Sequence, residues 1–206
     1  MRTELARRRD AVLLGIGFEG GFVVLAWLLG WLLNQPPFAV LHWRVADAAW
    51  GIAASLPLLF GLWLCLRWPV GPLARIKRFS EDVIAPLFQP CTMLDLAGIS
   101  LLAGLGEEML FRGVLQGWLG GWIGVWLGLA VASVLFGLLH PITPAYAVLA
   151  ALCGAYFGVI FMLTDNLLAV VIPHALYDFI ALLCLTRMPS RPLPEQGELA
   201  EQPHEP

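Results

Sequence analysis

The chain has 206 residues, of which 59% are hydrophobic and 13% are charged, with a formal net charge of −3 and a mean hydropathy of +0.79. A soluble domain of this length needs more charge to cover its water-facing surface, so the composition excludes an ordinary soluble protein and predicts one solvated largely by lipid. The bulk charge indicates no nucleic-acid partner.

The chain begins with a basic segment, residues 1–10, that carries four arginines ahead of a long apolar stretch. No A-x-A type cleavage signal ends that stretch, so we expect an uncleaved first membrane span rather than a signal peptide. The four cysteines have no CxxC spacing and lie within or beside apolar runs, where a free thiol behaves as a small hydrophobe. We expect neither disulfides nor a bound metal or cofactor.

Six apolar segments approach the roughly 20 residues that a helix needs to cross a hydrocarbon core about 30 Å thick. They cover residues 11–33, 45–66, 94–119, 123–139, 145–163 and 167–185. Proline-containing breakers close the first two segments. The sequence therefore predicts an all-α fold, a polytopic transmembrane bundle of about six spans in a single domain over residues 11–186.

Residues 70–90, between the second and third spans, place apolar residues at helical spacing and charged residues on the other faces. This pattern predicts an amphipathic helix on the membrane surface, with a plain solvated connector as the alternative. From residue 187 to 206 the chain is rich in Pro and Glu without apolar periodicity, which predicts a disordered tail.

Lysine and arginine are distributed unevenly along the chain. Four lie in the N-terminal segment, four in residues 67–90 and two in the tail, leaving Arg44 and Arg112 elsewhere. Six spans put the three basic segments on one side, so the positive-inside rule predicts that both termini are cytoplasmic. We expect a bacterial plasma (inner) membrane, with membrane lipid as a partner.

Ionisable residues are concentrated in three of the expected spans, although insertion scales assign a cost of about 2.5 to 3.5 kcal/mol to Arg, Lys or Asp at a helix centre. They are Glu107, Glu108 and Arg112 in the third span, His140 at the end of the fourth, and His174 and Asp178 in the sixth. Glu19 in the first span is the other deeply placed charge. Its glycine-rich surroundings leave open whether it is accessory to a site or a structural polar contact.

The spacing of these residues indicates pairs, because residues four apart share a helix face. Glu108 and Arg112 can form an ion pair, whereas Glu107 is displaced by about 100° around the helix and remains the free carboxylate. In the same way His174 can bond to Asp178.

Phe136 can stack beneath His140 at this same spacing. A carboxylate and a histidine together suit general acid and base work on a bound water, and a second histidine can supply a donor to an oxyanion. The cluster therefore favours hydrolysis, with a structural reading of each residue as the alternative.

Three motifs at these residues give the chain a family resemblance. EExxxR, FxxxH and HxxxD occur in order and read Glu107-Glu108-Met-Leu-Phe-Arg112, Phe136-Gly-Leu-Leu-His140 and His174-Ala-Leu-Tyr-Asp178. In these motifs the chain resembles the CPBP family, the CAAX prenyl endopeptidase and bacteriocin-processing (Abi) group of intramembrane glutamic peptidases. The resemblance covers roughly residues 94–185.

The resemblance implies an endopeptidase that acts on a protein or peptide in or at the membrane. It implies that Glu107 is the general base with His140 as its partner, that His174 and Asp178 form the oxyanion side, and that Glu108 and Arg112 order the site. The third motif ends in Asp where CAAX-processing members carry Asn. An ionised Asp cannot donate to an oxyanion, although it can orient His174.

Three other functions stay open at this point. His140, His174 and a glutamate offer three ligands for a zinc peptidase, although no HExxH is present. A non-enzymatic membrane scaffold or immunity-type protein of the same fold would need none of the charged set. A transporter could use buried carboxylates as proton relays, but no internal repeat is evident.

Overall fold

The structure is a computed structural model that describes residues 2–187, and this part of the chain is helical without strands. Its elements are α1 (Arg2–Leu32), α2 (Val45–Arg67), α3 (Pro72–Phe79), η1 (Ser80–Ile84), α4 (Ala85–Phe88), α5 (Met93–Glu108), η2 (Met109–Gln116), α6 (Gly117–Ile123), α7 (Val125–Leu138), α8 (Pro144–Thr164) and α9 (Leu168–Arg187), where η marks π-helix. The tail predicted to be disordered lies outside the described residues apart from Arg187. Helix α1 begins at Arg2, within the basic segment 1–10.

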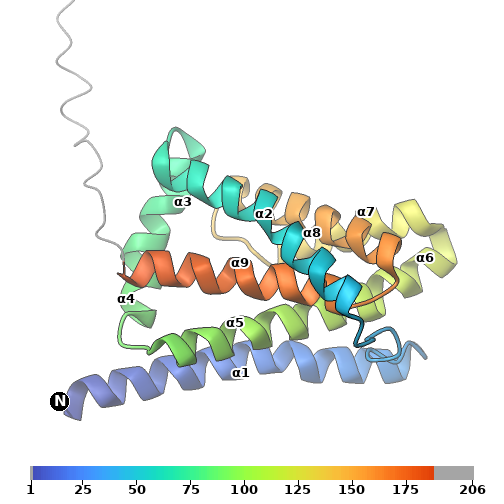
Figure 1. Cartoon of the computed structure of the whole chain (residues 1–206), viewed down its shortest axis with the longest axis horizontal. Coiled ribbons are helices and arrows are strands. Elements are labelled where there is room, and N and C mark those ends of the chain that lie inside the picture. The colour runs from blue at the N-terminus through green and yellow to red at the C-terminus, as the bar shows by residue number, and fades with distance from the viewer. Residues whose placement is uncertain (1, 188–206) are drawn as a thin grey trace, which may run out of the picture.

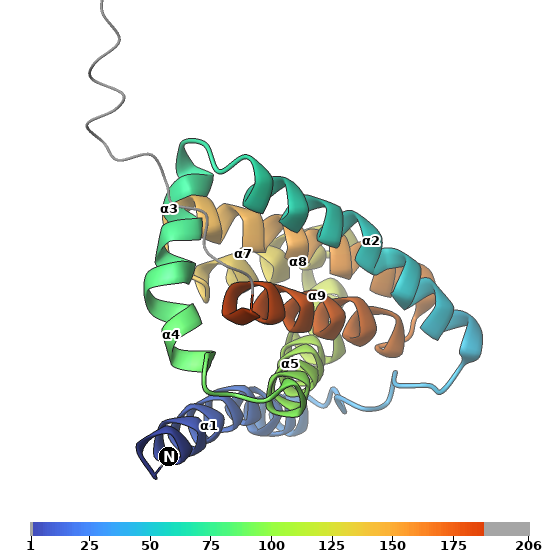
Figure 2. The same ribbon diagram turned by 60° about the vertical axis from the view of Figure 1, so that its left-hand side comes forward.

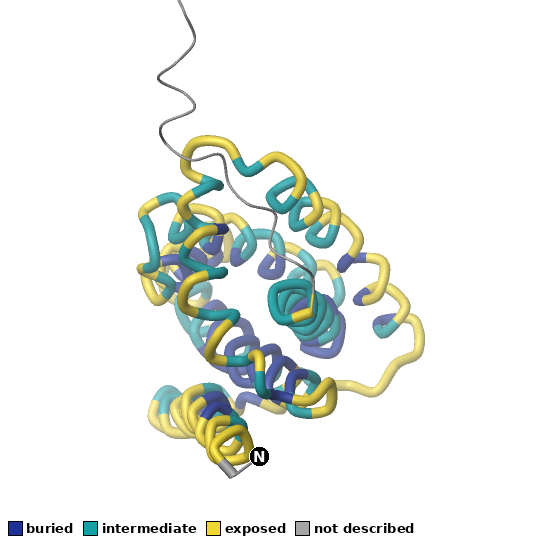
Figure 3. The backbone as a smooth tube through the Cα atoms, turned by 90° about the vertical axis from the view of Figure 1, so that its left-hand side faces the viewer, coloured by how far each residue is buried: buried dark blue, intermediate teal, exposed yellow. Residues whose placement is uncertain are grey.

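The bundle is built around α9, which lies between α5 and α2 (Figure 1). Helix α1 runs along the outer side of α5, and the paired helices α7 and α8 lie behind α9 and α2. Large apolar side chains on the periphery are exposed, for example Trp31, Trp50 and Trp126, whereas burial concentrates on α5, η2 and the first half of α9 (Figure 3). A water-soluble monomer rarely exposes so much apolar surface, so this is a lipid-facing exterior.

The predicted all-α, multi-pass membrane fold is confirmed. Four helices, α1 from Thr3, α2, α8 and α9, are long and apolar enough to span a membrane, and up to five spans result if the bent pair Pro72–Phe88 and Met93–Ile123 counts as one. Helix α7, in the fourth expected span, has 14 residues, which rise only about 21 Å. The count of six spans therefore stays a prediction.

Residues 70–90 form α3, η1 and α4, which cross the ends of the bundle helices on one side (Figure 2). This segment is helical, as the apolar spacing predicts. Lys77 is buried in it and pairs with Glu81 at 3.4 Å. Its placement on a membrane surface remains a prediction.

Two glycines of α5 allow its neighbours to approach closely. A Cβ on Gly104 would lie 2.9 Å from the Ala175 nitrogen of α9, and one on Gly106 would lie 2.9 Å from the Glu19 carbonyl oxygen of α1. Small residues at such crossings let helix backbones meet in a membrane. The end of α5 is thereby held between α9 and α1, directly before the paired glutamates.

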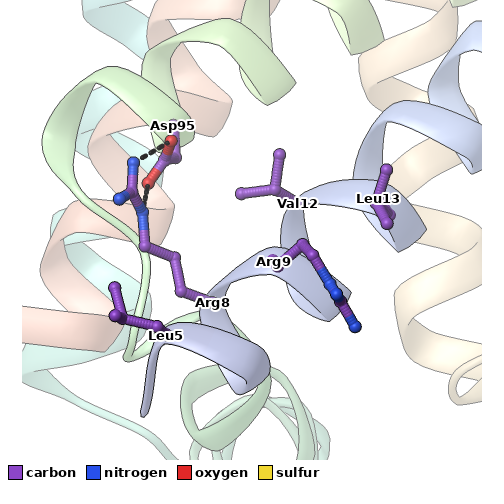
Figure 4. Close-up of a pocket in the computed structure, with 6 residues that line it drawn as sticks. All are labelled: Leu5, Arg8, Arg9, Val12, Leu13 and Asp95. Carbon is purple, nitrogen blue, oxygen red and sulfur yellow. Dashed lines mark hydrogen bonds and ion pairs between the residues drawn. The ribbon is translucent and has the colours of Figure 1, made fainter. Parts of the chain in front are cut away.

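The start of α5 is tied to α1 by ionic and capping contacts. Thr92 and Asp95 form a capping box, and Arg8 of α1 binds Asp95 through Nε–Oδ2 at 2.6 Å and Nη2–Oδ1 at 2.9 Å (Figure 4). Beside this ion pair is an open pocket of about 260 Å³ between the two helices. Together with the glycine contact, the ion pair fixes the position of α5 relative to α1.

Candidate active site

Glu108 lies at the centre of a buried polar cluster where α5 passes into η2. Its Oε1 accepts hydrogen bonds from Arg112 Nη1 at 3.1 Å and from His174 Nδ1 of α9 at 2.7 Å. Arg112 Nη2 also donates to the Gly154 carbonyl of α8 at 2.5 Å. Because both charges of this pair are fully buried, each depends on the other and on these further bonds for compensation.

Three aromatic rings surround the Arg112 guanidinium. Its Cζ lies 4.9 Å from the Phe136 ring centroid, 5.6 Å from that of Phe157 and 5.9 Å from that of Phe111. Cation–π attraction stabilises a guanidinium in such a cage. Arg112 itself belongs to the π-helical η2, and π-helical turns inside α-helices frequently occur at functional sites.

The hydrogen bonding of His140 determines which of its ring nitrogens carries a proton. This residue lies two positions beyond the end of α7, and its Nδ1 lies 2.8 Å from the Phe136 carbonyl oxygen. A carbonyl can only accept, so Nδ1 is the donor and Nε2 of the neutral ring is an acceptor. The ring stacks on Phe136 with centroids 4.8 Å apart, which directs Nε2 toward Glu107.

His174 is held from both sides of its ring. Nδ1 donates to Glu108, the ring stacks on Phe157 with centroids 5.1 Å apart, and Nε2 faces two further carboxylates. These are Asp178 Oδ2, in ion-pair contact at 3.4 Å, and Glu107 Oε2 at 4.0 Å. Spacing within one helix pairs His174 with Asp178 alone. The bond to Glu108 comes from a neighbouring helix, and sequence spacing carries no signal of it.

Glu107 is buried, yet its Oε2 has no hydrogen-bond partner among the described residues. Oε2 lies 3.9 Å from His140 Nε2 and 4.0 Å from His174 Nε2. Both distances are too long for a direct hydrogen bond, and a water could bridge such a separation. The structure thus brings all seven residues singled out from the sequence into one cluster, with the Glu107 carboxyl facing both histidines.

Glu19 of α1 lies beside this cluster. Its backbone carbonyl abuts Gly106, the residue before Glu107, and its side chain is close enough to Asp178 and Glu107 for their charges to interact. Glu19 Oε2 is buried and has no hydrogen-bond partner among the described residues. The first span therefore contributes an acid next to the site, whose role stays open.

Helix α8 also borders the cluster, although sequence analysis assigned it no part in the site. Gly154 and Phe157 contact Arg112 and His174, and Tyr146 lies near His140. Neutral side chains and a backbone carbonyl within an apolar helix give no chemical signal in the sequence. Within residues 2–187 no three or more His, Cys, Asp or Glu side chains form a group that could hold a metal ion.

Helical fold and buried polar cluster together define a multi-pass membrane protein with an internal site of carboxylates and histidines. Residues 89–180 match the family model described as type II CAAX prenyl endopeptidase, Rce1-like, and this match contains the seven residues of the three motifs. Residues 89–180 thus belong to the CPBP/CAAX protease family, which confirms the resemblance seen in the sequence. No curated protein and no solved structure shows a significant match.

The match of residues 89–180 to this family supports a CAAX-type membrane protease in general terms, with a protein or peptide substrate at the membrane. The matched segment runs from just before α5 to the middle of α9. It leaves α1, α2 and the connector α3–α4 outside.

Proposed function

We propose that the chain is an intramembrane endopeptidase that hydrolyses a peptide bond of a membrane-associated or lipid-anchored protein, using a water activated by Glu107 and His140. The observation that carries this proposal is the buried Glu107 Oε2, which has no hydrogen-bond partner within residues 2–187 and lies 3.9 Å from His140 Nε2 and 4.0 Å from His174 Nε2. A buried acceptor without a partner has a free-energy cost, and a bound water or substrate offsets that cost.

Two acceptors would polarise the water. Since His140 Nδ1 donates to Phe136, its Nε2 can accept one water hydrogen while Glu107 Oε2 accepts the other. The water oxygen then attacks the peptide carbonyl carbon, Glu107 takes the proton, and the carbonyl becomes an oxyanion. When the C–N bond breaks, Glu107 returns the proton to the leaving amine.

The remaining motif residues hold His174 in place, and His174 would stabilise the oxyanion that develops next to Glu107. Glu108 fixes the His174 ring through Nδ1, so that a protonated Nε2 points toward the oxyanion beside Glu107. Arg112 compensates the charge of Glu108, and Asp178 orients His174 from the other side. In this arrangement the mechanism uses only groups of the chain and water.

Orientation in the membrane is part of the same proposal. The N-terminal end of α1, the connector α3–α4 and the C-terminal end of α9 lie at one end of the bundle (Figure 1). The basic residues of segments 1–10 and 67–90, together with Arg187, belong to this end, which supports a cytoplasmic location for both termini in a bacterial-type plasma membrane. We propose that the site opens to the cytoplasmic half of the bilayer.

The test compares membrane proteins from cells that produce wild-type protein, Glu107→Ala or Glu81→Gln. Glu81 is a matched control, since it is a partly buried carboxylate outside the site. Mapping of protein termini by mass spectrometry should find at least one membrane protein that is cleaved in wild-type and Glu81→Gln cells and intact in Glu107→Ala cells. Identical termini in all three strains would reject the proposal.

A further inference from the structure

One face of helix α8 contacts the residues of the site. Phe157 stacks on His174, and the carbonyl of Gly154, almost one turn earlier, accepts from Arg112. Residues 146, 150, 153 and 157 recur at the helical spacing that keeps side chains on one face. The same face therefore reaches Tyr146, three turns before Phe157.

The beginning of α8 fixes where Tyr146 stands. Thr143 caps the helix and its Oγ1 accepts from the Tyr146 backbone nitrogen at 3.1 Å, while Pro144 occupies the first turn. The Tyr146 ring centroid lies 6.0 Å from that of His140. The His140 ring in turn faces Glu107, with Nε2 at 3.9 Å from Glu107 Oε2. Tyr146 thus borders the place where the water and the peptide bond would meet.

The hydroxyl of Tyr146 is not committed to another bond among the described residues. By contrast, Tyr156 on the same helix donates to the Ala54 carbonyl at 2.8 Å. A phenol that sits in a site without a hydrogen-bond partner is free to donate to a ligand there.

Most donors at this site already have acceptors. Arg112 donates through Nη1 to Glu108 and through Nη2 to Gly154, its Nε has no partner among the described residues, and His174 donates through Nδ1 to Glu108. His174 Nε2 is the remaining ring donor, and it is shared with Asp178, whose ionised carboxylate can only accept. An oxyanion formed beside Glu107 would therefore lie near the carboxylates of Glu107 and Asp178, with His174 Nε2 as the ring donor that faces Glu107.

We propose that the Tyr146 hydroxyl donates a hydrogen bond to the oxyanion that forms when water attacks the peptide carbonyl, which makes Tyr146 a catalytic residue. The assignment rests on the proposed function. Tyr146 supplies the second donor that Asp178 cannot supply, and the proton remains on the phenol throughout. Because the oxyanion exists only in the transition state and intermediate, the hydroxyl affects turnover rather than substrate binding.

The experiment is steady-state cleavage of the membrane protein that accumulates uncleaved in Glu107→Ala cells, with that protein and the purified protease in proteoliposomes. Tyr146→Phe keeps the ring and removes only the donor. Loss of one oxyanion donor lowers kcat by about 100-fold, and KM should change by less than about threefold. Tyr156→Phe, the matched control on α8, should keep kcat within about threefold of wild type.

A kcat within about threefold of wild type for Tyr146→Phe would overturn the inference, as would a rise in KM with unchanged kcat. Size-exclusion profiles and thermal unfolding in detergent establish that each variant is folded, which is expected because the lost hydroxyl has no partner in the described structure. The experiment distinguishes a failure of the proposed mechanism from a failure of the role given to Tyr146. Activity in Glu107→Ala would reject the proposed mechanism, whereas an inactive Glu107→Ala with a fully active Tyr146→Phe would reject only the role of Tyr146.

Discussion

Glu107 and Glu108 are adjacent in sequence but have opposite surroundings. Glu108 accepts hydrogen bonds from Arg112 and His174 at Oε1, although its Oε2 has no partner, whereas the Glu107 carboxylate accepts none from the described residues. Removal of a partner from a buried ion pair leaves an uncompensated charge, and removal of an unpartnered carboxylate does not. The two glutamates should therefore separate stability from activity.

We expect Glu108→Gln to lower the free energy of unfolding by about 3 kcal/mol, because Arg112 remains buried without its counter-charge. Glu107→Gln should unfold within about 1 kcal/mol of wild type. Unfolding in detergent micelles, followed by tryptophan fluorescence, measures both variants against wild type. Equal stability of the two variants would contradict the assignment of Glu108 as the structural member.

The sequence identifies the reactive residues and their partners within one helix, but not their partners on neighbouring helices. Helical spacing pairs Glu108 with Arg112, and that ion pair is present. The bond from Glu108 to His174 joins residues 66 positions apart, and the role of α8 depends on neutral residues. Such contacts depend on how helices pack, and a single sequence does not encode that in its spacing.

Close helix crossings at α5 position the paired glutamates. A Cβ added to Gly106 would lie 2.9 Å from the Glu19 carbonyl oxygen of α1, whereas a Cβ added to Gly98 on the same helix would have no atom within 4 Å. An alanine methyl group therefore fits at position 98 but not at position 106. The close approach of α1 to α5 at Gly106 is thus directly next to Glu107.

Gly106→Ala should destabilise the protein by about 1 to 3 kcal/mol and lower activity, because α1 must move away from the end of α5. Gly98→Ala should be neutral or stabilising by up to about 1 kcal/mol, since alanine favours a helix over glycine. Thermal unfolding and cleavage rates of the two variants provide the comparison. A Gly106→Ala variant as stable and active as Gly98→Ala would show that this crossing does not position the site.

Hydropathy predicts the helical membrane fold more directly than it predicts the number of spans. Long apolar runs predict helices because lipid cannot satisfy free backbone groups, and α1, α2, α8 and α9 occur where the runs lie. The third expected span instead belongs to a longer helical stretch through α5, η2 and α6, and α7 is short. Charged residues and glycines in this region weaken the apolar signal there.

Orientation gives a prediction for the whole molecule. Leu5 near the start of α1 and Trp43 in the loop before α2 are both exposed, and α1 separates them. A membrane-impermeant thiol reagent should label Trp43→Cys in intact cells and Leu5→Cys only after lysis, because we place the N-terminus in the cytoplasm. Labelling above the wild-type background reports each position. The reverse pattern would invert the proposed orientation.

Turnover by purified Glu107→Gln tests the central claim most directly. The measurement is the rate at which wild type and this variant cleave, in proteoliposomes, the membrane protein that accumulates uncleaved in Glu107→Ala cells. The account predicts a loss of at least about 100-fold in kcat with the fold intact, since the general base is gone and its site loses no structural bond. A folded Glu107→Gln variant that cleaves at the wild-type rate would contradict it.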